Sequence, residues 1–157
     1  MKNLILIRHG KATHKPMPDK KRFLTEKGIK RSRKFAEKLK EQNIKPDLII
    51  SSPAIRALDT AKIFAEIFNY PSNKIQINKN FYFAPDELVF NELYSLPNEK
   101  NTVFIFGHNP LWTELADYFS QNEIWHLRTS GIFGVSFDTN DWTKIETASK
   151  KDLVYIN

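Results

Sequence analysis

The chain has 157 residues, of which 41% are hydrophobic and 27% are charged. This length predicts one domain over residues 1–157, and this composition excludes a disordered or fibrous protein. The absence of cysteine excludes disulfides, thiolate zinc sites and a cysteine nucleophile. The net charge of +6 favours an anionic ligand or an acidic partner.

The apolar stretches of the sequence are short. The longest, at residues 3–7 and 47–50, fall far below the roughly 20 residues that span a bilayer, and the first residues lack the pattern of a signal peptide. We therefore expect no membrane association and a cytoplasmic location. Few aromatic residues are interleaved with the basic ones, so we expect no nucleic-acid partner.

The first half of the chain predicts strands that alternate with helices. The strands are expected to be buried on both faces, because their residues are almost all aliphatic. The expected elements are a strand at Lys2–Ile7, a helix capped by Thr25, a strand at Asp47–Ser51, a helix from Ser52-Pro53 to about Phe68 and an edge strand at Lys74–Asn78. The side chains expected to face inward from the two helices are Ile29, Phe35, Ala36, Leu39, Ala57, Ala61, Phe64, Ala65 and Phe68.

The second half continues this alternation and then predicts a β hairpin. The expected elements are a helix from Pro85 that buries Leu88, Val89 and Leu93, a strand at Thr102–Phe106, a helix started by Asn109-Pro110, β segments at Gly131–Asp138 and Trp142–Thr147, and an extended piece at Asp152–Ile156. A turn at Asn140-Asp141 would join the two β segments. The order of elements predicts an α/β fold, with a mainly parallel sheet covered by helices on both faces.

Ligands of such sheets bind beyond the carboxyl ends of the strands. The segments expected there are Arg8-His9-Gly10, Ser51-Ser52-Pro53 and Gly107-His108-Asn109-Pro110, with Arg56 nearby. Two histidines and two arginines at one rim predict a pocket for a compact dianion of the phosphate or sulfate type.

A histidine among positive charges stays neutral, so its lone pair can attack phosphorus. We therefore expect phosphoryl transfer through a phosphohistidine intermediate on His9, with Arg8 and Arg56 offsetting charge on the transferring group. No carboxylate cluster accompanies the histidines, so we expect no metal. No glycine-rich phosphate loop is present, so we expect no cofactor.

Five motifs in order carry a family resemblance from Leu4 to about Ser136. They are Leu-Ile-Arg8-His9-Gly10-Lys11-Ala12, Arg22-Phe-Leu24-Thr25-Glu-Lys-Gly28, Ser51-Ser52-Pro53-Ala-Ile-Arg56-Ala57-Leu-Asp59-Thr60-Ala61, Gly107-His108-Asn109-Pro110 and Thr129-Ser130-Gly131-Ile132. The sequence resembles the histidine phosphatase superfamily (phosphoglycerate mutase-like), and within it the short SixA-type phosphohistidine phosphatases.

The resemblance implies a three-layer α/β/α sandwich with one strand antiparallel to the rest. It implies that His9 becomes phosphorylated, that Arg8 and Arg56 bind the phosphoryl group, and that His108 contacts this group and stabilises the transition state. Arg22 matches a basic residue at the pocket mouth. The implied partner is a phosphorylated protein, which would be either a phosphotransfer domain or a phosphocarrier protein. The further substrate-binding candidates are Arg22, Asn109 and Ser52.

The sequence also departs from the family pattern. Lys21-Arg22-Phe23 replaces Asp-Arg-Pro, and Asp59 replaces a glutamine, where it could pair with a pocket arginine or face solvent. Asp86 and Glu87 are the only candidates for the general acid that ester-cleaving relatives use, and SixA-type members lack this acid. Two alternatives stay open: a small-molecule phosphomonoesterase with Asp86 or Glu87 as general acid, and a non-catalytic phosphate or phosphoprotein binder.

Overall fold

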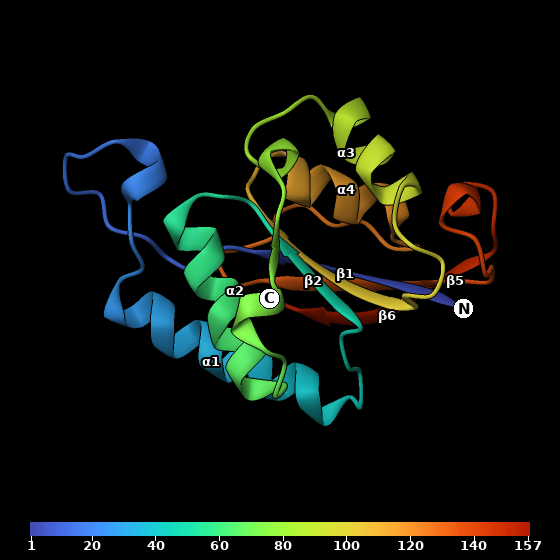
Figure 1. Cartoon of the computed structure of the whole chain (residues 1–157), viewed down its shortest axis with the longest axis horizontal. Coiled ribbons are helices and arrows are strands. Elements are labelled where there is room, and N and C mark those ends of the chain that lie inside the picture. Colours follow the sequence, from blue (N-terminus) through green and yellow to red (C-terminus); the bar gives the residue numbers. More distant parts are fainter.

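Six strands form one mixed sheet in the computed structural model, which describes residues 1–157 (Figure 1). The strands are β1 (Lys2–Arg8), β2 (Leu48–Ser51), β3 (Gln76–Ile77), β4 (Thr102–Gly107), β5 (Ile132–Phe137) and β6 (Lys150–Ile156). They lie in the order β3-β2-β4-β1-β5-β6, and only β5 runs against the direction of the other five. The predicted mostly parallel sheet with one antiparallel strand is confirmed.

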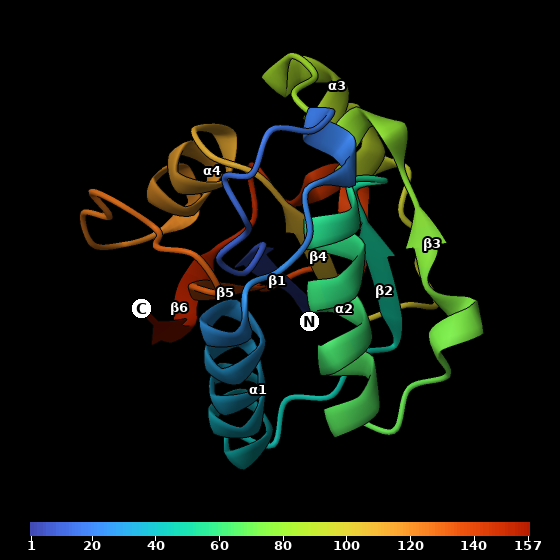
Figure 2. The ribbon, with the colours of Figure 1, turned by 90° about the vertical axis from the view of Figure 1, so that its left-hand side faces the viewer.

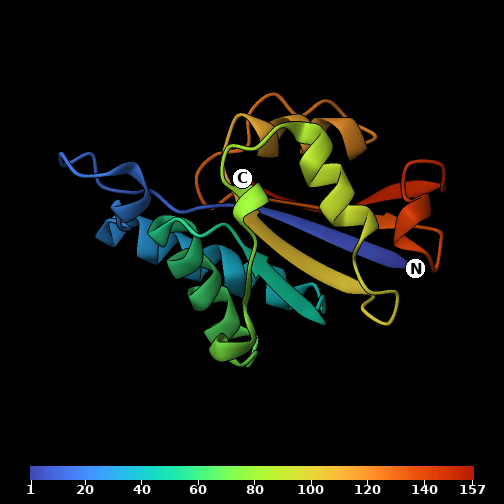
Figure 3. The same cartoon turned by 45° about the horizontal axis from the view of Figure 1, so that its top comes forward.

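Helices cover both faces of the sheet (Figure 3). One layer holds α1 (Glu26–Glu41) and α2 (Ile55–Ile67), and the other holds α3 (Asp86–Tyr94) and α4 (Leu111–Phe119). Short 3-10 turns are η1 (Asp19–Lys21), η2 (Ser72–Lys74), η3 (Lys79–Phe81) and η4 (Trp142–Lys144). None of the helices combines the length and apolar character that crossing a membrane requires.

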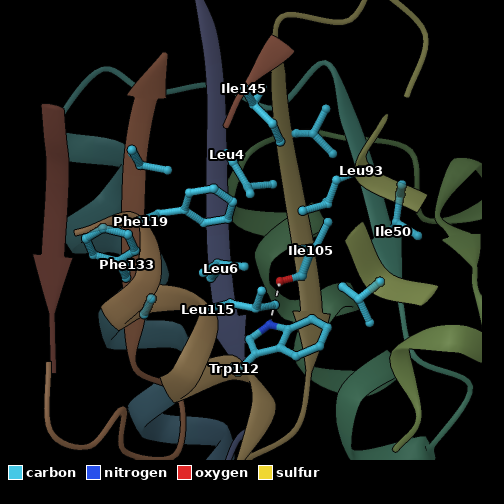
Figure 4. Packing of buried hydrophobic residues seen from close by; sticks show 14 of the residues in the cluster. Leu4, Leu6, Ile50, Leu93, Ile105, Trp112, Leu115, Phe119, Phe133 and Ile145 are labelled. Atoms are coloured by element: carbon cyan, nitrogen blue, oxygen red, sulfur yellow. Dashed lines mark hydrogen bonds between the residues drawn. The ribbon is translucent and has the colours of Figure 1, made fainter. Parts of the chain in front are cut away.

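The aliphatic run of β1 divides its side chains between two apolar clusters. Leu4 and Leu6 join the cluster beneath α3 and α4, whereas Ile5 and Ile7 join the cluster above α1 and α2. Successive side chains of a strand point to opposite faces, so a strand covered on both sides is apolar throughout. Figure 4 shows Trp112 in the first cluster, with its indole nitrogen donating to the carbonyl of Ile105.

Helix starts agree with the sequence at α1 and differ at α2 and α4. The Thr25 hydroxyl caps α1 by accepting from the Gly28 amide at 3.0 Å, as predicted. The prediction that Ser52-Pro53 starts α2 is wrong, because α2 begins at Ile55 and the Ser52 hydroxyl accepts from the Ala54 amide just before it. Helix α4 begins at Leu111, after the Asn109-Pro110 pair rather than at its proline.

Three side chains predicted to face inward are less buried than expected. Ile29 is 42% exposed because it packs in a hollow with Phe23 and Ile63, away from the sheet. Leu88 is exposed because the buried side of α3 is formed by Val89 and Leu93, which are four residues apart. Leu88 directly precedes Val89 in the helix and therefore points in a different direction. Phe68, at the end of α2, is half-buried with its ring edge-on to that of Phe104.

The predicted hairpin partner of β5 is wrong. Residues 142–144 form η4, and β5 pairs instead with β6, in the region of the extended piece expected at Asp152–Ile156. Asp141 caps η4 by accepting from the Thr143 amide and hydroxyl, while the buried Trp142 indole donates to the Lys100 carbonyl. These bonds turn the segment away from the sheet. The edge strand β3 has two residues, because Asn78 then caps η3.

Candidate active site

The carboxyl ends of β1 and β4 lie side by side and bring the two histidines together. The His9 amide donates to the Gly107 carbonyl at 3.1 Å, and the His9 and His108 ring centroids are 5.1 Å apart. The next amide, of Gly10, donates to the Thr60 hydroxyl on α2 at 2.9 Å. The turn after β1 is therefore fixed to both neighbouring elements, which sets the position of the His9 ring.

Hydrogen bonding determines which nitrogen of His9 is free. Its Nδ1 lies 2.7 Å from the Gly10 carbonyl oxygen, which can only accept, so Nδ1 carries the proton and Nε2 keeps a lone pair. Burial is the main cause that lowers the pKa of His9 to about 3, against the raising effect of the Gly10 hydrogen bond, and the positive charges of Arg56 and Arg8 lower it further. His9 is therefore a neutral imidazole at physiological pH.

His108 is also buried and neutral. Its Nε2 lies 2.8 Å from the Ser52 hydroxyl, which accepts from the Ala54 amide and, with its second lone pair and its proton, can either accept from this nitrogen or donate to it. When the hydroxyl donates, His108 holds its proton on Nδ1, and this nitrogen has no hydrogen-bond partner. Burial first, and then the nearby His9 and Arg56, lower the pKa of His108 to about 2.

Three unpartnered nitrogen atoms belong to residues of this site. Only four buried side-chain nitrogen or oxygen atoms in the protein lack a hydrogen-bond partner, and they include Arg8 Nε, Arg56 Nε and His108 Nδ1. Each arginine is held by its terminal nitrogens, Arg8 on the Leu127 carbonyl and Arg56 on Asp19. Unsatisfied buried donors are costly, so this arrangement suits a ligand rich in acceptor oxygens, such as a tetrahedral oxyanion.

Asp19 is a site residue that the sequence analysis missed. Its carboxylate accepts from Arg56 Nη2 at 3.0 Å, from Arg22 Nη1 at 3.1 Å and from the Tyr82 hydroxyl. The Tyr82 hydrogen bond and then those of the two arginines hold the pKa of Asp19 well below its usual range, against the opposing effect of burial. Figure 2 shows η1, which carries Asp19, at the N-terminal end of α2.

Asp19 therefore connects the loop before α1 to α2 and to the segment after η3. The three-residue spacing between Asp19 and Arg22, ideal for an ion pair in a helical turn, is the one sequence signal that could have indicated it. Arg22 reaches the site through this ion pair, and its Nε is held by the Thr13 carbonyl.

Two further sequence candidates have their side chains engaged or directed elsewhere. The Asn109 amide donates to the Leu127 carbonyl and accepts from Thr113, so both of its ends bind the protein itself. Asp59 forms no hydrogen bond or ion pair and lies in the hollow with Phe23 and Ile63, so it does not pair with a pocket arginine.

The two general-acid candidates differ in position. Asp86 lines a hollow of about 310 Å³ together with His108, whereas Glu87 is exposed and does not line it. The Asp86 carboxylate accepts from the Glu87 amide at 2.9 Å. No group of three or more His, Cys, Asp or Glu side chains gathers in a way that could hold a metal ion.

Comparison with known proteins agrees with this geometry. The family model "Histidine phosphatase superfamily (branch 1)" matches residues 4–81. Phosphohistidine phosphatase SixA of Escherichia coli (strain K12) is 30% identical over 137 residues, which cover 86% of this chain and 85% of that protein. The chain belongs to the histidine phosphatase superfamily.

Two further comparisons show how far the similarity extends. A solved structure of the protein histidine phosphatase SixA complexed with tungstate superposes with a TM-score of 0.78 at 28% identity, covering 87% of this chain and 88% of that one. Serine/threonine-protein phosphatase Pgam5 of Drosophila persimilis is 33% identical over 75 residues, or 48% of this chain. The matched part spans 26% of the length of Pgam5.

Proposed function

We propose that this histidine phosphatase hydrolyses phosphohistidine on a protein through a phosphorylated His9. The observation that carries the proposal is the free Nε2 lone pair of a neutral His9, beside the unpartnered Nε–H groups of Arg8 and Arg56 and the unpartnered Nδ1 of His108. A nucleophile and a set of preorganised donors are what phosphoryl transfer requires, since catalysis consists mainly of positioning and charge stabilisation.

In the first step, His9 Nε2 attacks phosphorus as the phosphorus–nitrogen bond of the substrate breaks. The substrate imidazole leaves as a neutral ring when its second nitrogen carries a proton. The Nε–H groups of Arg8 and Arg56 and the Nδ1–H of His108 stabilise charge on the equatorial oxygens. In the second step, water attacks phosphorus, the bond to His9 breaks, and phosphate leaves. His9 Nδ1 keeps its proton on the Gly10 carbonyl throughout.

A phosphohistidine substrate fits the site because no carboxyl group hydrogen-bonds to either histidine. Imidazole is a better leaving group than an alkoxide and requires less proton donation. The similar E. coli protein is named a phosphohistidine phosphatase, and the similar solved structure holds tungstate, a tetrahedral oxyanion. We propose a phosphotransfer domain or phosphocarrier protein as the substrate, and no metal or cofactor.

The test compares kcat/KM for a phosphohistidine peptide and for an alkyl phosphate ester, whose leaving group is an alkoxide. We expect the peptide to be the faster substrate, and His9→Ala to abolish its hydrolysis. A faster ester would favour a phosphomonoesterase. Binding of phosphate or of the peptide without turnover would instead favour the non-catalytic binder.

The phosphomonoesterase is kept as a second candidate because Asp86 shares a hollow with His108. If Asp86 is a general acid, Asp86→Asn slows ester hydrolysis but leaves phosphohistidine hydrolysis nearly unchanged. Equal effects on the two substrates would show that Asp86 donates no proton to the leaving group. Glu87→Gln is the matched control, because it removes a neighbouring exposed carboxylate.

A further inference from the structure

Three hollows adjoin one another around α4, and Glu114 lines all of them. Their volumes are about 310, 290 and 240 Å³. The first has the His108 ring in its wall, so the surface begins at the active site. His108 is 3% exposed, and its Nδ1 has no partner. We call this surface the α4 hollows.

The α4 hollows are acidic on a protein whose net charge is +6. No lysine or arginine lines them, and none of their carboxylates takes part in an ion pair. These carboxylates belong to Asp86, Glu114, Asp117, Glu123 and Glu146. Lys150 approaches Tyr118, but its amine lies over the Tyr118 ring and donates to the Tyr118 carbonyl. The carboxylates of this surface are therefore without ion-pair partners, and only Asp86, Asp117 and Glu146 accept hydrogen bonds, all from neutral donors.

The same surface exposes large aromatic side chains. Phe83, Tyr118 and Trp125 are 57%, 53% and 85% exposed. The Phe83 ring lies 4.9 Å from that of His108, and its backbone φ of 50° is a strained conformation for a bulky residue. Strain of this kind concentrates at functional sites. Phe83, Trp125 and Tyr118 line the first, second and third hollow, so each hollow offers an exposed aromatic ring to a partner.

We propose that the α4 hollows bind a basic segment of the substrate protein that flanks its phosphohistidine. This inference rests on the proposed function. The phosphoryl group occupies the arginine pocket, and the chain that carries it leaves past His108 toward Glu114. Lysine or arginine side chains on that segment meet the unpaired carboxylates, and their apolar stems pack on Phe83 and Trp125. Charge complementarity thus selects a cationic partner segment although the protein itself is basic.

The experiment uses three substrates and two variants. The substrates are free phosphohistidine, a phosphohistidine peptide flanked by lysines and the same peptide flanked by glutamates. For the wild type we expect a KM about fivefold lower for the lysine-flanked peptide, as two or three exposed charge pairs would give. Glu114→Lys removes this preference and leaves kcat/KM for free phosphohistidine unchanged. Glu37→Lys, an equal charge change on the exposed side of α1, keeps the preference.

Each outcome bears on a different claim. Equal KM values for the two peptides, or a preference that survives Glu114→Lys, overturn the docking inference while phosphohistidine hydrolysis stands. If no phosphohistidine compound is hydrolysed, the proposed function fails. Docking is then measured separately, by following Trp125 fluorescence as unphosphorylated peptides are added. We expect the lysine-flanked peptide to have a lower Kd than the glutamate-flanked peptide. Equal binding of these two peptides would overturn the inference there as well.

Discussion

Asp19 gives the sharpest prediction, because its carboxylate holds three groups around the site. Its hydrogen bonds run from Arg22, Arg56 and Tyr82. A buried hydrogen bond to a charged group is worth about 1.5–3 kcal/mol, but the Asp19 side chain is 44% exposed, which reduces each to roughly 0.7 kcal/mol. Asp19→Ala should therefore lower the free energy of unfolding by about 2 kcal/mol and the Tm by about 4–8 °C.

The kinetic effect of Asp19→Asn should separate kcat from KM. Asparagine keeps an acceptor for Arg56 but removes the charge that fixes its orientation, so we expect kcat for phosphohistidine to fall about tenfold. KM should change little, because the lost negative charge also strengthens attraction of the dianion. Steady-state kinetics with a folded-fraction control decides this. An unchanged kcat would refute the claim that Asp19 orients Arg56.

The contribution of Asp19 to stability should also depend on pH. Its pKa is lower in the folded protein than the value of about 3.9 expected in the unfolded chain. Its contribution is therefore fully present above about pH 4 and lost as the pH falls toward the folded pKa. The Tm difference between wild type and Asp19→Asn should be largest at pH 7 and shrink at about pH 2. A difference that grows in acid would contradict the reasoning.

Three further predictions concern the histidines and their supports. The pKa of His9 is lowered to about 3, so His9 should stay neutral between pH 7 and about pH 5, and its protonation should not reduce kcat/KM in this range. A tenfold loss of kcat/KM per pH unit in this range would contradict a neutral buried nucleophile. Ser52→Ala removes the partner of His108 Nε2 and the acceptor of the Ala54 amide, so it should lower kcat about tenfold and also lower the Tm by a few degrees, whereas wild-type kcat would deny the pairing with His108 a role. In Gly107→Ala the new Cβ would lie 2.3 Å from the Trp112 ring. This overpacking should lower the free energy of unfolding by about 1–3 kcal/mol, which thermal unfolding would detect as a lower Tm. An unchanged Tm would show that the ring moves aside without cost.

The sequence was informative where one physical factor dominated. The aliphatic runs at β1 and β4 identified strands buried on both faces, and the motif residues at their ends lie together in the structure. Helix α2 begins two residues later than the sequence predicts, at Ile55 rather than Pro53. The Ser52 side chain bonds across the fold to His108, which is a long-range contact. Local capping rules do not include such a long-range partner.

Tertiary contacts also determined what the sequence could not indicate. Trp142 has a strand-like sequence context, but its indole is buried and bonded to the Lys100 carbonyl, which places it in a turn. In the sequence, Asp19 is typical of a solvated loop residue. In the structure it binds Arg56 and Tyr82, which lie 37 and 63 residues away along the chain. Single-sequence patterns report local periodicity, whereas these roles arise from contacts between distant segments.

The central claim is that His9 Nε2 accepts the phosphoryl group. Rapid mixing with a phosphohistidine peptide, an alkaline quench that preserves phosphoramidate bonds and peptide mass spectrometry tests it most directly. We predict a phosphoryl group on the peptide that contains His9, formed and lost at rates that match turnover, and absent in His9→Ala. Sustained hydrolysis without this adduct, or an adduct on another residue, would contradict the account.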